Sequence, residues 1–243
     1  MSDPFAGKTW WLIGASEGLG RALAVAMDKR GARLILSARS KDPLRSLASG
    51  LSDATVLPLD VTDRASVSAA WERASDADGV LYCVGAYEPM PATAWDADAV
   101  EMMIETNFTG AVRVLSHVVP AYAARGQGRI MLIGSLSGYR GLPDAIGYGA
   151  SKAAQMHLAE NLLIDLKGSG VTVQMANPGF IDTRLTKKNR FKMPQLMQPD
   201  TAADHVIRAI DSERFETAFP RPFSLLFTLG RFLPRRLFNR LFA

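Results

Sequence analysis

The chain of 243 residues contains one cysteine, Cys83, and three histidines, His117, His157 and His205. A single cysteine excludes an intrachain disulfide and suits a reducing compartment, so we expect a cytoplasmic protein. No two histidines have the spacing of metal ligands, and we predict no metal site. The sequence also lacks a charge-free stretch as long as a membrane-spanning helix, and its first residues do not have the pattern of a signal peptide.

Neither sign of charge is in large excess. The net charge is +4 and 21% of the residues are charged, which gives no argument for a nucleic-acid partner. Hydrophobic residues make up 48%, enough for one large core, and the length suits one α/β domain better than two. We expect a single folded domain that carries the functional site over residues 1–219, followed by a separate tail over residues 220–243.

Short apolar runs alternate with stretches of helix-forming residues. The runs lie at 10–13, 33–37, 55–59, 80–84, 129–133 and 171–176. The helical stretches lie at 19–30, 42–48, 67–74, 100–124 and 151–167, and the stretch 100–124 is expected as one helix or as two pieces. This alternation predicts an α/β fold with a doubly wound, mostly parallel sheet and helices on both faces. Ligands of such sheets bind beyond the carboxyl ends of the strands. The irregular, basic segment 180–199 is expected to cover that site as a mobile part of the domain.

A glycine-rich turn, Gly14-Ala15-Ser16-Glu17-Gly18-Leu19-Gly20, joins the first expected strand to the first helix. Glycines allow close approach of a phosphate to the backbone, and a helix N-terminus attracts negative charge, so the turn predicts a dinucleotide site. A tight turn without a ligand is the plain alternative. The same residues also fit the G-x-S-x-G elbow of serine hydrolases, with Ser16 as nucleophile and a histidine such as His205. That elbow normally follows several strands, whereas this one follows the first.

The end of the second expected strand indicates which dinucleotide is bound. A carboxylate there would hold the ribose hydroxyls of NAD, and the sequence has Ser37 and Arg39 instead. Because a guanidinium binds phosphate well, we predict a preference for NADP(H), with NAD(H) possible. The negative charge of Glu17 works against this preference. Asp60, after the third strand, is either an adenine contact or a helix cap.

Tyr148 and Lys152 are four residues apart, and Ser135 precedes Tyr148 by thirteen residues. On one helix an i, i+4 pair shares a face, which would place the Lys152 ammonium beside the phenol. The unperturbed tyrosine pKa is about 10, and an adjacent cation lowers it by stabilising phenolate. With Ser135 as hydrogen-bond donor to a carbonyl, Tyr148 could exchange a proton with the substrate oxygen. The three residues predict an enzyme that interconverts ketones or aldehydes and alcohols with a hydride carrier.

Together these motifs resemble the short-chain dehydrogenase/reductase family in its single-domain form, over about residues 8–179. The resemblance implies a Rossmann fold, a homodimer or homotetramer, and a proton-relay water held by Asn107. It also extends the set of expected cofactor contacts. The full set is Gly14, Ser16, Glu17, Gly18, Leu19, Gly20, Ser37, Arg39, Asp60, Val61, Gly85, Tyr148, Lys152, Pro178, Gly179, Ile181 and Thr183.

Two residues depart from the family pattern. Ile13 stands where threonine is usual, and Tyr82 stands where an asparagine normally ties the fourth strand to its neighbours. The segments expected to choose the substrate are 86–96, 142–146 and 180–199, whose methionines and Phe191 suggest an apolar cleft. A non-catalytic protein that keeps the dinucleotide as a structural or sensing ligand is the alternative from another class.

The tail contains no acidic residue from Phe219 onward. Its last turn is expected to place Arg235, Arg236, Asn239 and Arg240 on one face, and Leu237, Phe238, Leu241 and Phe242 on the other. One interpretation is a helix in a membrane interface, with arginines at anionic head groups. The other is a tail that packs on its own cleft or on a neighbouring subunit.

Overall fold

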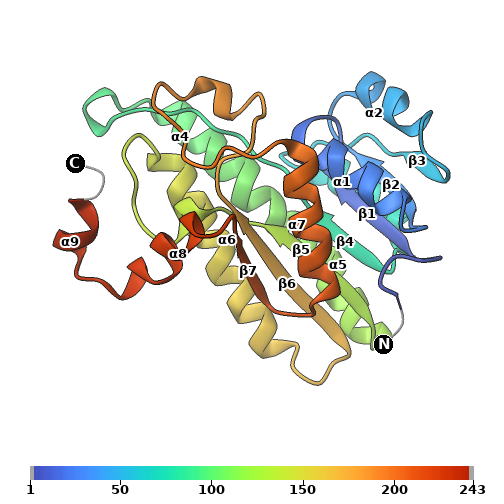
Figure 1. Ribbon diagram of the computed structural model, residues 1–243. Coiled ribbons are helices and arrows are strands. Elements are labelled where there is room, and N and C mark those ends of the chain that lie inside the picture. Colours follow the sequence, from blue (N-terminus) through green and yellow to red (C-terminus); the bar gives the residue numbers. More distant parts are fainter. Residues whose placement is uncertain (1–2, 241–243) are drawn as a thin grey trace.

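A seven-stranded parallel sheet runs through the middle of the molecule in the computed structural model, which describes residues 3–240 (Figure 1). The strand order is β3-β2-β1-β4-β5-β6-β7, so the order reverses between β1 and β4. This arrangement confirms the doubly wound α/β fold predicted from the sequence. The strands are β1 Thr9–Ile13, β2 Arg33–Ser37, β3 Ala54–Val56, β4 Gly79–Tyr82, β5 Gly128–Ile133, β6 Val171–Pro178 and β7 Glu216–Phe219.

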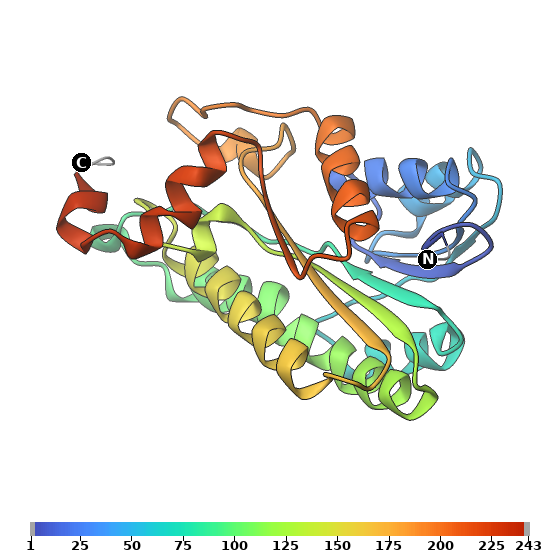
Figure 2. The ribbon, with the colours of Figure 1, turned by 60° about the horizontal axis from the view of Figure 1, so that its bottom comes forward.

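Helices cover both faces of the sheet (Figures 1 and 2). Helices α1, α2 and α7 pack on one face, and α3, α5 and α6 pack on the other, with α4 against α6. The helices are α1 Gly18–Asp28, α2 Lys41–Ala48, α3 Arg64–Ala74, α4 Ala97–Ile104, α5 Gly110–Arg125, α6 Ile146–Asp165, α7 Pro199–Asp211, α8 Phe223–Thr228 and α9 Arg235–Asn239.

The central strand β1 shows why the sequence folds in three layers. Trp10 and Leu12 belong to the core beneath α1 and α7, whereas Trp11 and Ile13 belong to the core beneath α3, α5 and α6. Alternate side chains of a strand point to opposite faces, so a strand buried on both sides must be apolar throughout. The short apolar run at the start of the chain therefore places the glycine turn at the end of the central strand.

Several elements differ from the sequence prediction. β7 was not expected. Helix α6 begins at Ile146 rather than at residue 151, so Tyr148 lies within it. The stretch predicted at 100–124 does form two helices, α4 and α5, but the π-helical turn over Glu105–Thr109 that joins them was not expected. The turn in the middle holds Asn107.

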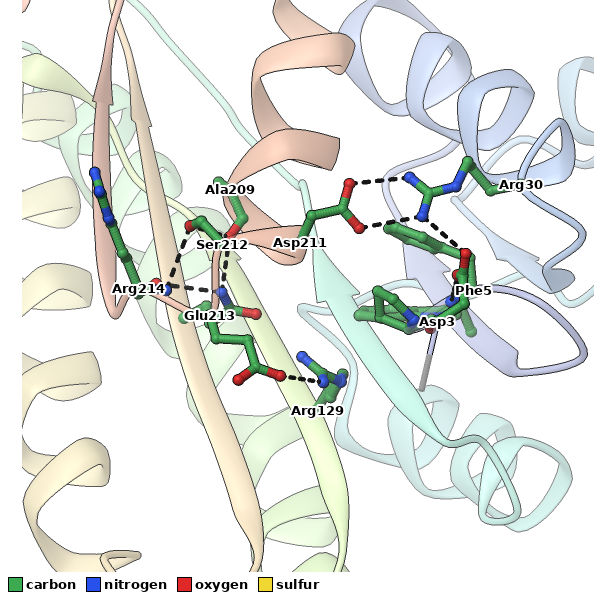
Figure 3. Close-up of polar contacts among 12 residues, drawn as sticks. Asp3, Phe5, Arg30, Arg129, Ala209, Asp211, Ser212, Glu213 and Arg214 are labelled. Carbon is green, nitrogen blue, oxygen red and sulfur yellow. Dashed lines mark hydrogen bonds and ion pairs between the residues drawn. The ribbon is translucent and has the colours of Figure 1, made fainter. Parts of the chain in front are cut away.

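Ion pairs near the amino-terminal ends of the strands attach β7 and α7 to the rest of the fold (Figure 3). Arg30, just after α1, pairs with Asp3 at 3.0 Å and with Asp211 at 2.9 Å. Arg129 of β5 pairs with Glu213, just before β7, at 3.1 Å. Such partly exposed pairs each contribute about 0 to 1 kcal/mol, so the apolar packing of α7 against α1 supplies most of the attachment.

After β7 the chain continues as α8 and α9, which lie beyond the carboxyl end of β6 (Figure 2). Phe227 and Phe238 are buried there and form a small cluster with Leu136. Leu237 is exposed while Phe238 is buried, so the expected single apolar face of the last turn is divided. Leu241 and Phe242 lie outside the described residues. Within residues 3–240, the helices are too short or too polar to span a membrane.

Candidate active site

A cavity of about 1220 Å³ opens at the carboxyl ends of β1, β4, β5 and β6. Within the described residues, its lining includes every expected site residue except Ser37 and Asn107. These lining residues are Gly14, Ser16, Glu17, Gly18, Leu19, Gly20, Arg39, Asp60, Val61, Gly85, Ser135, Tyr148, Lys152, Pro178, Gly179, Ile181 and Thr183. The topology therefore brings together residues that the sequence separates by more than 160 positions.

The glycine turn is shaped for a ligand at the start of α1. Gly14 has a φ of +96°, and a Cβ there would lie 2.8 Å from the carbonyl carbon of Cys83. A Cβ on Gly20 would collide with the carbonyl oxygen of Gly14, so the helix can approach the strand this closely only with glycine. Glu17 is the N-cap residue of α1, but its side chain makes no capping hydrogen bond. The first N–H groups of this helix are therefore open to an anion such as a pyrophosphate.

Glu17 instead binds the segment that follows β6. Its carboxylate accepts hydrogen bonds from Arg184, at 2.9 Å from Nε and 2.6 Å from Nη2. The two ends of this segment are hydrogen-bonded to each other, because Asp182 N–H donates to the carbonyl of Met197 at 2.8 Å. Further along, Lys188 pairs with Glu88. Residues 180–199 thus bridge the glycine turn and the loop after β4, and Arg184 neutralises the negative charge of Glu17.

The end of β2 differs from the expectation at Ser37. The Ser37 hydroxyl is buried, donates to the carbonyl of Leu57 at 2.7 Å and accepts from the Trp11 indole N–H at 2.9 Å. It is therefore occupied within the fold and does not face the cavity. Arg39 lines the cavity and is exposed. The side chain that can reach a dinucleotide is therefore that of Arg39, two residues after the end of β2, and not that of Ser37.

Asp60 also lines the cavity, and it does not cap α3. Its carboxylate accepts hydrogen bonds from the N–H and the hydroxyl of Thr62, at 2.9 and 2.7 Å. Burial favours the neutral acid, but these hydrogen bonds and the nearby Arg39 outweigh burial and lower the pKa of Asp60. The cap of α3 is Asp63, which accepts from Ala65 N–H at 2.9 Å. An anionic Asp60 remains available as a polar contact at the cavity wall.

Tyr148 lies in the first turn of α6, beside Ser135 at the end of β5. The pKa of the Tyr148 phenol is not lowered, contrary to the prediction made from the neighbouring Lys152. Burial raises it instead, and a hydrogen bond with Ser135 opposes that rise. The Ser135 oxygen accepts hydrogen bonds from the N–H and the hydroxyl of Ser137, at 3.2 and 3.0 Å. Ser137 thereby orients Ser135, because an oxygen that already accepts two hydrogen bonds must direct its own hydrogen elsewhere.

Lys152 is buried one turn after Tyr148, and its Nζ lies 5.9 Å from the centre of the Tyr148 ring. Nζ donates to the carbonyl of Ile133 at 2.7 Å and to Oε1 of Gln155 at 3.1 Å. Burial lowers the pKa of Lys152 to about 8. An ammonium group has three hydrogens, so one remains for a ligand in the cavity.

Asn107 braces the site from outside the cavity. Its side chain accepts from Ala86 N–H at 2.6 Å and donates to the carbonyl of Ala86 and to the Ser151 hydroxyl, both at 2.9 Å. It therefore joins the loop after β4 to helix α6. Tyr82, the residue found in place of the family asparagine, donates its hydroxyl to the carbonyl of Thr106 at 2.7 Å and so forms its own tie to this π-helical turn.

Several cavity residues were not singled out from the sequence. Tyr87 packs edge-on against Tyr148, with ring centres 5.0 Å apart, and donates its hydroxyl to Asn189 at 2.8 Å. Burial raises the pKa of Tyr87 to about 12, so its phenol stays neutral. Phe223 and Phe227 of α8 also line the cavity. The only sequence signal for these residues was their membership of an apolar or irregular segment.

The structure does not favour a serine hydrolase. Ser16 lines the cavity, but the His205 ring stacks on Phe219, with ring centres 4.7 Å apart, among residues of α7 and β7. Cys83 lies near Lys152, and burial raises the pKa of its thiol to about 12. The thiol therefore stays protonated and is a poor nucleophile. Tyr148 and Lys152 are buried titratable groups in the lining of this cavity.

A model of the short chain dehydrogenase family matches residues 8–194. The chain belongs to this family. The match confirms the resemblance seen in the sequence and makes the protein an oxidoreductase of alcohol and carbonyl groups. A relative from Myxococcus xanthus, described as an uncharacterized oxidoreductase, is 35% identical over 241 residues, which cover 96% of this chain and 95% of the relative. An oxidoreductase from Staphylococcus haemolyticus is 28% identical and covers 84% of this chain and 91% of its own.

Solved short-chain dehydrogenases have the same fold. One from Burkholderia cenocepacia, in complex with NADP, is 26% identical with a TM-score of 0.86, over 98% of this chain and 99% of its own. One from Sphingobium yanoikuyae, in complex with NADPH, is 25% identical with a TM-score of 0.82, over 94% of this chain and 97% of its own. These likenesses and the open N-terminus of α1 agree that this short-chain dehydrogenase binds a nicotinamide dinucleotide.

Proposed function

We propose that this short-chain dehydrogenase interconverts an apolar ketone or aldehyde and its alcohol with NADP(H), with Tyr148 as general acid and base. The observation that carries the proposal is that Tyr148, Ser135 and Lys152 share one cavity with the open N-terminus of α1. A proton donor and a hydride carrier must reach the two ends of the same carbonyl bond, and a shared cavity allows this.

Tyr148 suits the role of proton donor in the reducing direction. Because burial raises its pKa, the phenol is protonated near neutral pH and can give its proton to the substrate oxygen. Ser135, held by Ser137, can turn its hydrogen from Tyr148 to that oxygen. In the oxidising direction the phenolate accepts the proton of the alcohol.

Lys152 supports the phenolate and orients the dinucleotide. Its charge favours the anionic form of the neighbouring Tyr148, and its third hydrogen is free for a ribose hydroxyl. The dinucleotide, when bound, supplies or accepts the hydride. Residues of the glycine turn would hold its pyrophosphate, and Asp60 and Val61 would lie beside its adenine. Asn107 would help to hold a relay water through the π-helical turn.

Several observations support NADP(H) over NAD(H). Arg39 is exposed at the cavity wall and can bind a 2′-phosphate, and no carboxylate lies within residues 33–40. The charge of Glu17, which would repel that phosphate, is paired with Arg184. The solved relatives that contain NADP and NADPH add weight to the same preference.

An apolar substrate is proposed because several aromatic and aliphatic side chains line the cavity that contains Tyr148. They include Tyr87, Leu142, Phe180, Phe191, Phe223 and Phe227. Consumption of NADPH, followed by its absorbance with a panel of ketones and aldehydes of increasing chain length, tests the proposal. We expect turnover that improves with apolar length. Binding of NADPH without oxidation by any member of the panel would instead support a dinucleotide-binding protein without catalysis.

A further inference from the structure

The segment 220–240 has two apolar faces, and only one of them packs on the protein. On α8, Phe223 and Phe227 are one helical turn apart and face the cavity, with Phe227 1% exposed. Leu225 and Leu229 are displaced from them by two residues, which turns them to the opposite side of the helix. They are 38% and 61% exposed.

The outward apolar side continues after α8. Phe232 is 74% exposed, Leu233 is 41% exposed and Leu237 is 50% exposed. Of the twelve large apolar side chains that are exposed among the described residues, five lie in this short stretch. Single exposed apolar residues are ordinary, but a cluster marks a contact surface. We call Leu225, Leu229, Phe232, Leu233 and Leu237 the outer tail face.

Five arginines lie in the same stretch of sequence as the outer tail face. Among residues 3–240, none of the five tail arginines forms an ion pair, which is also true of most other arginines; Arg30, Arg113, Arg129 and Arg184 are examples that do pair with Asp or Glu. The sequence 220–243 contains no acidic residue. These tail arginines are Arg221, Arg231, Arg235, Arg236 and Arg240.

The combination of exposed apolar residues and arginines favours one of two partners, a membrane surface or a second copy of the chain. An apolar strip flanked by cations is complementary to an interface where acyl chains meet anionic head groups. A two-fold contact with a second copy would bring the same arginines against one another, and like charges across an interface oppose association. The charge pattern therefore favours lipid over self-association.

We propose that the outer tail face docks on the surface of an anionic membrane. The opposite face of α8 lines the active-site cavity, so docking would place that cavity beside the lipid. A second hollow of about 850 Å³, lined by Arg231 and Arg235, adjoins the cavity and shares Ser137 and Leu142 with it. This geometry would give substrates dissolved in the membrane a short path to the cavity. The docking itself does not depend on the proposed activity.

Flotation of the full chain with vesicles tests the proposal. One set of vesicles contains phosphatidylcholine alone, and the other contains phosphatidylcholine with phosphatidylglycerol. The protein should float with the anionic vesicles and remain in solution with the neutral ones. Added salt should release it, because screening weakens the attraction of arginine to head groups.

Two variants with matched controls locate the contact. The triple change Leu229→Ser, Phe232→Ser and Leu237→Ser should abolish flotation, while Leu163→Ser with Ile164→Ser, at the exposed end of α6, should not. Charge reversal by Arg236→Glu with Arg240→Glu should reduce binding by at least about fivefold for each arginine. Arg64→Glu with Arg73→Glu, both exposed residues of α3, is the control for that pair.

Thermal melting and NADPH binding show whether each variant is folded. Because all the changed side chains are exposed, we expect the melting temperature and the NADPH affinity of each variant to match those of the unchanged chain. The proposal is overturned if the unchanged chain stays in solution with anionic vesicles. It is equally overturned if the control variants lose flotation as completely as the tail variants. A smaller particle mass for the triple variant, without flotation of the unchanged chain, would assign the outer tail face to self-association.

Discussion

Raising the pH should remove a charge that this site needs. Burial lowers the pKa of Lys152 to about 8, and the proposed mechanism requires its ammonium form to bind the dinucleotide and to stabilise phenolate. The value of kcat/KM for NADPH, measured with saturating carbonyl substrate, reports ionisations of the free enzyme. We therefore expect kcat/KM for NADPH to be nearly constant between about pH 6 and pH 7 and to fall above about pH 8.

The size of the fall follows from that pKa. With a pKa of about 8, roughly nine tenths of the Lys152 side chains are charged at pH 7 and roughly one tenth at pH 9. The limiting decline is about tenfold for each further pH unit. Tyr148 does not cause a limb near pH 8, because burial raises its pKa above the ordinary value.

Lys152→Arg separates this cause from others. Arginine keeps its charge to a pH above about 12, so the variant should lose activity through altered shape but show no decline near pH 8. A flat profile for the unchanged chain up to about pH 10 would refute the argument. So would a decline with the same midpoint in the arginine variant.

Two further predictions concern cofactor choice. Arg39→Ala should raise KM for NADPH by about tenfold and leave KM for NADH unchanged. This factor is near the lower end of the range for loss of a charged hydrogen bond, because Arg39 is exposed. Steady-state kinetics with both cofactors checks this. Arg184→Ala should weaken NADPH binding by leaving the Glu17 carboxylate unpaired, and adding Glu17→Gln should restore it. Fluorescence titration measures both, and equal weakening in the single and double variants would contradict the role of this ion pair.

Much of the site could be predicted because its signals are local. The alternation of apolar runs and helices predicts a parallel sheet. The glycine turn and the Tyr148/Lys152 pair then lie near the carboxyl ends of its strands. The residue spacing of four also places both side chains on one face of α6, as the structure confirms.

The features that escaped prediction depend on contacts between distant residues. β7 has only four residues, and Glu216 at its start is bound by Tyr139 and Asn177 at 2.7 and 2.8 Å. A charged residue in a short run gives no strand signal until those partners are known. The Ser37 hydroxyl turns inward because the buried Trp11 indole needs an acceptor, which its place at the end of a strand does not reveal.

Helix α6 was predicted to begin too late for a local reason. Its first turn contains Gly147 and Gly149 and has no side-chain cap, so residue preferences argue against helix there. Packing decides the matter, since a Cβ on Gly147 would lie 2.7 Å from the methyl group of Met103 in α4. The ion pair of Glu17 with Arg184 is another case, because it joins residues 167 positions apart.

Tyr148→Phe tests the central claim most directly, because it removes one hydroxyl and keeps the ring against Tyr87. We expect turnover with the best carbonyl substrate to fall by about 10² to 10⁴, the usual contribution of a positioned acid. NADPH affinity, measured by fluorescence in the same preparation, should be unchanged. Turnover that stays within a factor of about two of the unchanged chain would show that another group delivers the proton.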